Sequence, residues 1–144
     1  LLDLSLGNKL ELAFFDIEGN KISTSSLGID YTLVDFWASW CKPCRQETPT
    51  IKYALQKYPN NFAVYAVSLD DKRAAWQRAI NEDSTQMFKH LIGTYPNGQR
   101  SRLLRQLNIE IIPTNFLIDN NQRIIAKDLH GERLIQVLDS LIQK

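Results

Sequence analysis

The chain of 144 residues has little of several features that would point to particular classes of protein. It contains two cysteines and one methionine, and 17 Lys and Arg side chains are balanced by 16 Asp and Glu. Balanced charge argues against nucleic-acid binding, because domains that bind a polyanion carry an excess of basic side chains. Two cysteines are also too few to staple a small secreted domain, and a chain of this length buries enough surface without them.

Long hydrophobic runs are absent as well. No stretch approaches the ~18 apolar residues that span a bilayer, and no basic segment followed by an apolar one has the form of a signal peptide. We therefore expect no membrane contact from this segment. The chain begins with Leu1 and Leu2 and has no initiating methionine. We expect residues 1–144 to be a single domain cut from a longer precursor, whose remainder leaves room for an N-terminal anchor.

The hydrophobic pattern predicts an α/β fold built on one mixed sheet. Helices alternate with apolar strands in the middle of the chain, which predicts a parallel core, and a late hairpin adds an antiparallel edge. An early hairpin turns at Gly19 and Asn20, and Asp70 and Asp71 are expected to cap a helix. Residues 87–94 have no clear pattern. The expected strands are 10–15, a return from 22, 32–37, 62–69, 114–118 and 123–127, and the expected helices are 42–58 (kinked at Pro49), 72–81, 101–107 and 132–143.

The two cysteines stand at Cys41 and Cys44, directly after a predicted buried strand and at the start of a predicted helix. One helical turn brings two thiols with this spacing within disulfide reach. Backbone N–H groups at a helix start stabilise a thiolate on Cys41, and Pro43 is tolerated there because the first turn lacks N–H partners. The motif predicts a nucleophilic Cys41 that forms a mixed disulfide, and a shielded Cys44 that resolves it.

A cysteine pair can also belong to a metal site, a haem attachment site or an inactive domain. A structural zinc site needs four ligands, and only His90 and His130 remain, without zinc-finger spacing. Attachment of a c-type haem requires a histidine directly after Cys44, where Arg45 stands. An inert pair in a redox-inactive domain stays an alternative. We expect no metal and no cofactor, and ordinary structural roles for both histidines.

The segment Phe36-Trp37-Ala38-Ser39-Trp40-Cys41-Lys42-Pro43-Cys44 resembles the active-site strand and helix of the thioredoxin superfamily. Ile112-Pro113-Thr114, at the start of a predicted strand, resembles the cis-proline loop of that superfamily. The resemblance implies a thioredoxin-like fold in which Ile112 and a cis Pro113 lie beside the cysteine pair and bind the incoming peptide. A cis X–Pro bond holds such a tight turn at modest energetic cost.

Within the superfamily the chain resembles the TlpA/ResA-like branch, the extracytoplasmic thiol-disulfide oxidoreductases of bacteria. Its N-terminal hairpin, its helical insert after the second core strand and the run Cys44-Arg45-Gln46-Glu47-Thr48-Pro49 all match that branch. The resemblance covers roughly residues 10–144. Two departures concern Asp35, where this branch often has Asn, and Val67, which falls at about the position of a lysine that thioredoxins place near the aspartate.

Two carboxylates are candidates for work on the thiols. Asp35 lies on a predicted buried strand, where loss of hydration raises a carboxyl pKa and suits a general base for Cys44. Thioredoxins carry a proton-relay aspartate at this position. The resemblance implies that Glu47, one helical turn after Cys44, is a second carboxylate that tunes the thiols. The plainer alternatives are a structural polar residue at Asp35 and a solvated one at Glu47.

Several other positions are expected to form a surface for a peptide substrate. Trp40 precedes the nucleophile and is expected to be partly exposed, as a platform for docking, whereas Trp37 is expected in the core. Lys42 is expected to be exposed, and its positive charge favours a thiolate on Cys41. Pro43, Ile112 and Pro113 complete the expected substrate-binding set.

These observations predict an enzyme, a thiol-disulfide oxidoreductase that reduces protein disulfides. Its expected partners are a disulfide-bearing protein and an upstream dithiol that returns electrons. By resemblance the protein works in the bacterial periplasm or tethered outside the cytoplasm, with the cytoplasm as the alternative that Asp35 suggests. A redox-switch binding module without turnover is a second hypothesis. A thiol peroxidase is a third and weaker one, because Trp37 stands where peroxiredoxins have a threonine.

Overall fold

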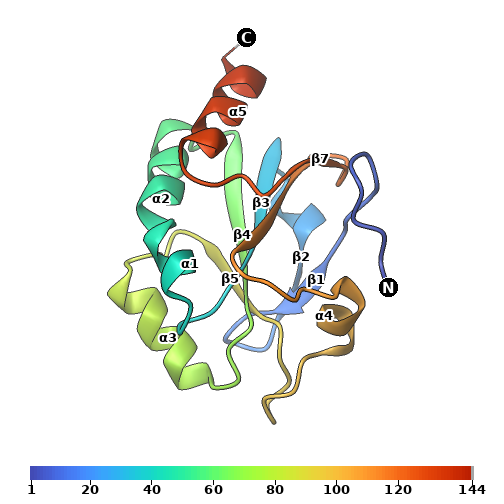
Figure 1. The fold of residues 1–144 in the computed structure, drawn as a ribbon, viewed down its shortest axis with the longest axis vertical. Helices are drawn as coiled ribbons and strands as arrows, with labels where there is room; N and C mark the ends of the chain where they lie inside the picture. Colours follow the sequence, from blue (N-terminus) through green and yellow to red (C-terminus); the bar gives the residue numbers. More distant parts are fainter. Residues whose placement is uncertain (144) are drawn as a thin grey trace.

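A computed structural model describes residues 1–143, which form a mixed seven-stranded sheet in the order β2-β1-β5-β4-β3-β6-β7 (Figure 1). The predicted α/β class with a mixed central sheet is confirmed. The strands are β1 (Ala13–Phe15), β2 (Lys21–Ser23), β3 (Tyr31–Trp37), β4 (Phe62–Ser68), β5 (Lys89–Ile92), β6 (Thr114–Asp119) and β7 (Ile124–Lys127). The helices are the 3₁₀ turn η1 (Thr24–Leu27), α1 (Lys42–Gln46), α2 (Thr48–Lys57), α3 (Arg73–Glu82), α4 (Arg102–Leu107) and α5 (Glu132–Ile142).

Strand β3 lies in the middle of the core. It pairs with β4 in parallel and with β6 antiparallel, and β7 continues the antiparallel edge, as the late hairpin predicted. Six of its seven residues are buried, which matches its near-continuous apolar sequence. Because β3 runs directly into the segment that holds Cys41, a buried central strand that is paired on both sides fixes the start of the cysteine motif.

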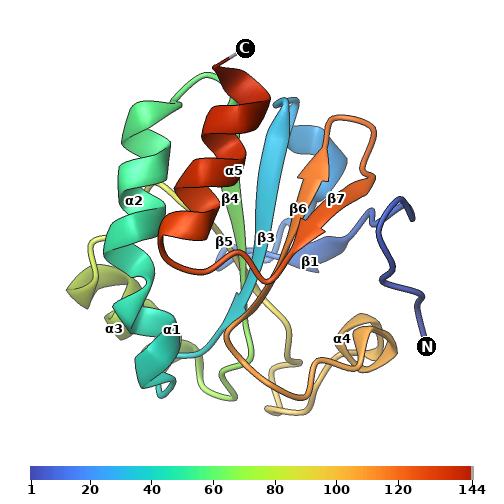
Figure 2. The same ribbon diagram turned by 45° about the horizontal axis from the view of Figure 1, so that its top comes forward.

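Helices cover both faces of the sheet. The views in Figures 1 and 2 show α2 and α5 side by side, and the Tyr58 hydroxyl donates a hydrogen bond to Asp139 between them. Helix α4 packs on the opposite face, where a Cβ added at Gly93 would meet the side chains of Leu104 and Val67. Consecutive strand residues point to opposite faces. Val67 faces α4, so its neighbour Ala66 faces the opposite side of the sheet, where the cysteines lie.

The early hairpin is confirmed, but the sequence missed the strand that joins it to the core. Strand β5 falls in the unassigned residues 87–94 and pairs in parallel with β4 and antiparallel with β1. The insert after β4 is therefore a helix followed by a strand rather than helical throughout. The first expected strand is also shorter than predicted, because Leu10 N–H donates to the Gln122 carbonyl, outside the hairpin.

Two local expectations concern helix boundaries. The expected kink near Pro49 is a break at Glu47, which separates α1 from α2 and leaves Pro49 in the first turn of α2. The expectation that Asp70 and Asp71 cap the following helix was wrong. Residue Lys72 stands at the cap position of α3 without a side-chain hydrogen bond. Asp70 instead accepts hydrogen bonds from Ser39 and Ser68 in the core.

Candidate active site

The cysteine motif begins one turn after β3 ends. Cys41 and Cys44 are joined by a disulfide, with their Cα atoms 5.3 Å apart. Cys41 is the N-cap of α1, and its Sγ accepts a hydrogen bond from the Cys44 N–H at 3.2 Å. Once the disulfide is reduced, the same N–H is placed to stabilise a thiolate on Cys41. Both cysteines are 5% exposed, so burial alone does not tell the nucleophile from its partner.

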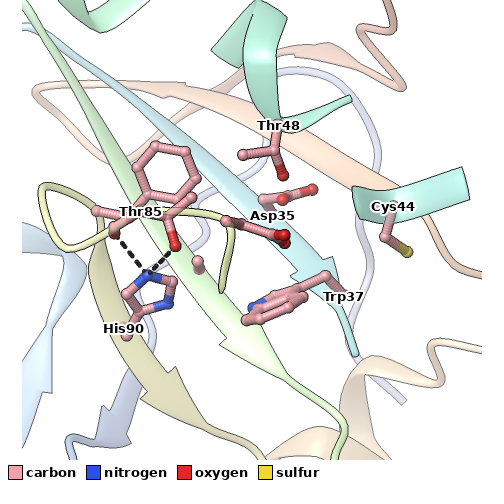
Figure 3. A pocket seen from close by; sticks show the side chains of 9 residues that line it. Asp35, Trp37, Cys44, Thr48, Thr85 and His90 are labelled. Atoms are coloured by element: carbon pink, nitrogen blue, oxygen red, sulfur yellow. Dashed lines mark hydrogen bonds between the residues drawn. The ribbon is translucent and has the colours of Figure 1, made fainter. Parts of the chain in front are cut away.

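The surroundings of the two sulfurs differ more than their exposure does. Cys44 lines a small pocket with Asp35 and Trp37 (Figure 3). Cys41 is flanked by Trp40, Lys42 and Pro43, all three of them exposed. Cys44 thus lines the pocket that holds the Asp35 carboxyl group, whereas exposed side chains flank Cys41.

Asp35 is buried in the middle of β3, with 8% of its surface exposed. Burial and, to a lesser extent, repulsion from Glu47 together raise the pKa of Asp35 to about 8. The expected burial and raised pKa are both found. The strand neighbour of Asp35 on β4 is Ala66, one position from the expected Val67. Neither side chain carries an amino group that could offset the carboxylate.

Glu47 occupies the break between α1 and α2, where its side chain is 20% exposed. Its Oε1 lies 2.7 Å from the Nδ1 of His130, which belongs to the loop before α5. The sequence did not predict this partner for His130. No local sequence pattern indicates the contact between Glu47 and His130, because the two residues are 83 positions apart.

Polar side chains fasten the motif to the rest of the molecule. The Arg45 guanidinium donates to both carboxylate oxygens of Asp83 at 2.9 Å and to the Ser39 carbonyl at 3.1 Å. This two-point pairing raises the pKa of Arg45. Asp70, 1% exposed, accepts from the Ser39 N–H at 2.9 Å. These contacts hold the loop before Cys41 from two directions, and sequence reasoning assigned neither Asp83 nor Asp70 to the site.

The loop before β6 starts beside the end of β3. The Ile112–Pro113 bond is cis, as the resemblance implied. Thr114, the next residue, pairs with Phe36 on β3, so Pro113 lies alongside the segment that leads to the cysteines. Ile112 and Pro113 are partly buried, and Ile111 is 75% exposed. Trp40 is 66% exposed, so both edges of the motif present apolar side chains to solvent.

His90 is a second histidine whose position the sequence did not indicate. It lies on β5, the unassigned strand, and lines the same pocket as Asp35 and Cys44. Its ring lies 5.9 Å from that of Trp37, centroid to centroid. Burial lowers the pKa of His90 to about 4, so its imidazole is neutral at pH 7.

Comparisons with known proteins agree with this site. A family model described as thioredoxin-like matches residues 28–124. ResA of Bacillus cereus (strain ZK / E33L), named a thiol-disulfide oxidoreductase, is 27% identical over 136 residues, covering 90% of this chain and 71% of that protein. A thiol:disulfide interchange protein DsbE homolog of Paracoccus denitrificans is 34% identical over 95 residues, covering 66% of this chain and 48% of that protein.

Solved structures are similar over nearly the whole chain. The thioredoxin domain of a thiol-disulfide oxidoreductase from Bacteroides vulgatus has a TM-score of 0.85 and 27% identity, covering 97% of this chain and 99% of that one. A thiol-disulfide oxidoreductase from Bacteroides fragilis has a TM-score of 0.79 and 30% identity, covering 93% and 98%. With the Cys41–Cys44 disulfide at the end of β3, these likenesses establish that the chain belongs to the thioredoxin-like family, as a thiol-disulfide oxidoreductase.

Proposed function

We propose that this oxidoreductase works as a reductase of protein disulfides, with Cys41 as nucleophile, Cys44 as resolving cysteine and Asp35 as the proton acceptor for Cys44. The observation that carries the proposal is the buried Asp35 carboxyl in the pocket that Cys44 lines. A dithiol becomes a strong oxidant when its reduced form is stabilised. Carboxylates near the thiols do the opposite, because they disfavour thiolates and thereby favour the disulfide.

The reaction exchanges the substrate disulfide for the Cys41–Cys44 disulfide, so two electrons pass from the enzyme dithiol to the substrate. The Cys41 thiolate attacks one substrate sulfur, the substrate S–S bond breaks, and the second substrate sulfur leaves and takes up a proton. The Cys44 thiol then gives its proton to the Asp35 carboxylate and attacks the Cys41 sulfur, which breaks the S–S bond between Cys41 and the substrate. The expelled substrate sulfur takes up a proton, so the substrate leaves as a dithiol. The Cys41–Cys44 disulfide remains until an upstream dithiol returns two electrons to it.

The reduction potential tests the direction of the reaction. Equilibration of the Cys41–Cys44 pair with dithiothreitol is expected to give a value near that of thioredoxin, about −270 mV, or lower. A value near that of DsbA, about −120 mV, overturns the reductase assignment and makes the protein a dithiol oxidant. Reduction of insulin by dithiothreitol separates turnover from a redox switch, which would not accelerate the reaction.

The role of Asp35 is tested by Asp35→Asn, which keeps the shape and removes the base. We expect attack by Cys41 to stay close to the wild-type rate. Resolution of a preformed mixed disulfide should slow by about 10²–10³ at pH 7, within the usual range for loss of a general base. The difference should shrink at high pH, where the Cys44 thiol ionises without help. Unchanged resolution at pH 7 removes Asp35 from the mechanism.

For the substrate, we propose an extended peptide segment that lies between Trp40 and the loop of Ile112 and Pro113. Lys42 and Pro43 form the exposed turn beside it, and Lys42 also favours a thiolate on Cys41. Trp40→Ala should lower kcat/KM for a protein disulfide several-fold and leave reduction of a small aromatic disulfide unchanged. Phe15→Ala, an exposed aromatic residue on the hairpin, is the matched control. Equal losses for both substrates contradict docking at Trp40.

We also propose that the protein works outside the cytoplasm, because its resemblance to the TlpA/ResA-like branch extends from the hairpin to the last helix. Within residues 1–143, no helix is long and apolar enough to cross a membrane. Fusion of the full-length gene product to a reporter that is active only outside the cytoplasm tests the location. Reporter activity confined to a cytoplasmic fusion contradicts it.

A further inference from the structure

Three strands bring Asp35 and His90 to opposite sides of one small cavity. Asp35 on β3 pairs with Ala66 on β4, and Ala66 pairs with His90 on β5. Residues at matching register positions project from the same face of a sheet. Because the residue between them is an alanine, the space above it is left open. The cavity measures about 10 Å³ and is lined by Asp35, Trp37, Ala66 and His90 among others (Figure 3).

The hydrogen bonds of His90 define its tautomer. Its Nε2 lies 2.8 Å from the Thr85 carbonyl oxygen and 3.1 Å from the Thr85 hydroxyl. A carbonyl oxygen only accepts, so Nε2 carries the hydrogen of the neutral ring and Nδ1 is a bare acceptor. That Nδ1 is buried and has no hydrogen-bond partner among residues 1–143.

Trp37 presents the complementary group. It is 7% exposed, and its Nε1–H is a donor that likewise has no partner within the described part of the chain. Burial of polar groups without hydrogen bonds is costly, and native proteins satisfy them with protein atoms or ordered water. The cavity therefore brings together a donor on Trp37, an acceptor on His90 and the carboxyl group of Asp35.

We propose that His90 is a positioning residue that, together with Trp37, holds one water molecule against the Asp35 carboxyl group. The water accepts a hydrogen bond from Trp37 Nε1 and donates one each to His90 Nδ1 and Asp35. Three hydrogen bonds are typical of a buried water, and about 10–15 Å³ is the least volume that holds one. One molecule thereby satisfies both orphaned groups and supplies the Asp35 carboxylate with a donor.

The water's hydrogen bond to Asp35 affects the ionisation of that carboxyl group, because the other charges around the pocket disfavour the carboxylate. Burial and Glu47 both disfavour the Asp35 carboxylate. Among residues 1–143, the one other acidic side chain that lines the cavity is Asp83, and the Arg45 guanidinium donates hydrogen bonds to both of its carboxylate oxygens. The neutral His90 offers no positive charge at pH 7. Because a hydrogen bond to the charged form favours it, the water lets Asp35 ionise at a lower pH. This inference rests on the proposed role of Asp35 as the proton acceptor.

A crystal structure of the oxidised wild-type protein is the first test. The expected result is one water within hydrogen-bond distance of Trp37 Nε1, His90 Nδ1 and an Asp35 oxygen. A cavity without solvent density, or a direct hydrogen bond between His90 and Asp35, overturns the proposal. This test needs no variant and no turnover.

A carboxyl NMR titration of the oxidised protein measures the consequence. His90→Leu and Trp37→Phe each remove one partner of the water, and each should raise the pKa of Asp35 by about one, a tenfold loss of ionisation. The double variant should raise it no further, because both changes release the same molecule. His90→Asn keeps an acceptor near the Nδ1 position and should restore the wild-type value. Phe88→Leu, an apolar change in the same wall, is the control.

The outcomes separate this proposal from the one on which it rests. An unchanged Asp35 pKa in His90→Leu, or additive effects in the double variant, overturns the shared water. An Asp35→Asn variant that resolves the mixed disulfide at the wild-type rate overturns the role of Asp35 instead. The structure and titrations of the oxidised protein do not depend on that rate.

Discussion

Glu47 and His130 are joined by a hydrogen bond of 2.7 Å that ties the end of α1 to the loop before α5. The loop is also tied to β6, because the Asn115 side chain donates a hydrogen bond to the Leu129 carbonyl and accepts one from the Leu129 N–H. Glu47 is thereby held in place as a partly buried carboxylate near Asp35. The second acidic residue of the motif is positioned by a segment more than eighty residues away.

Neutralising Glu47 should make Asp35 a stronger acid. Glu47→Gln removes the repulsion that contributes to the raised pKa of Asp35, so that pKa should fall by up to about one and stay above the ordinary value, since burial is the larger cause. A carboxyl NMR titration measures the change. Glu18→Gln in the exposed hairpin turn is the control. A pKa of Asp35 that is unchanged or higher in Glu47→Gln contradicts this arrangement of charges.

The stability of the oxidised protein should fall as the pH rises, because of Asp35. Its pKa is about 8 in the folded protein and near 3.8 when unfolded. The folded state therefore binds more protons between these values, and stability decreases with pH across that window. Asp35→Asn removes this effect. Its free energy of unfolding minus that of the wild type should be at least ~2 kcal/mol larger at pH 9 than at pH 5, which means that the variant is relatively more stable at high pH. Denaturant titrations at the two pH values measure it, and a constant difference contradicts it.

His90 should act with the opposite sign and in acid. Its pKa is about 4 in the folded protein against 6.5 in the unfolded chain. The unfolded state therefore binds the extra proton, and stability is lost as the pH falls from about 6.5 to 4. His90→Asn cannot titrate, so its stability should decline less over that range, by up to ~3 kcal/mol. Parallel pH profiles for the variant and the wild type would show that His90 is not the group responsible.

The sequence predicted the parts of this molecule that depend on local pattern. Apolar runs identified β3, β4 and β6, and the spacing of Cys41 and Cys44 after β3 identified the redox pair. The misses share a physical cause, namely that their partners are distant in sequence. Lys89 and His90 become strand residues only because β4 and β1 offer free edges. Asp70 does not cap the helix, because folding brings Ser39, 31 positions earlier, within hydrogen-bond distance of its carboxylate. No local signal links His130 to Glu47.

The attachment of the hairpin to the core gives a last test, at Tyr65. This tyrosine is fully buried on β4, and its hydroxyl donates to the Ile22 carbonyl at 2.6 Å and accepts from the Phe14 N–H at 3.0 Å. Tyr65→Phe leaves both hairpin groups without their partner, which costs about 1–3 kcal/mol for a buried polar group. We expect that loss in denaturant titrations, together with faster hydrogen exchange at the Phe14 amide. Tyr53→Phe, at an exposed tyrosine on α2, controls for loss of a hydroxyl. Equal stabilities for the two variants would mean that the hairpin is held by its apolar contacts alone.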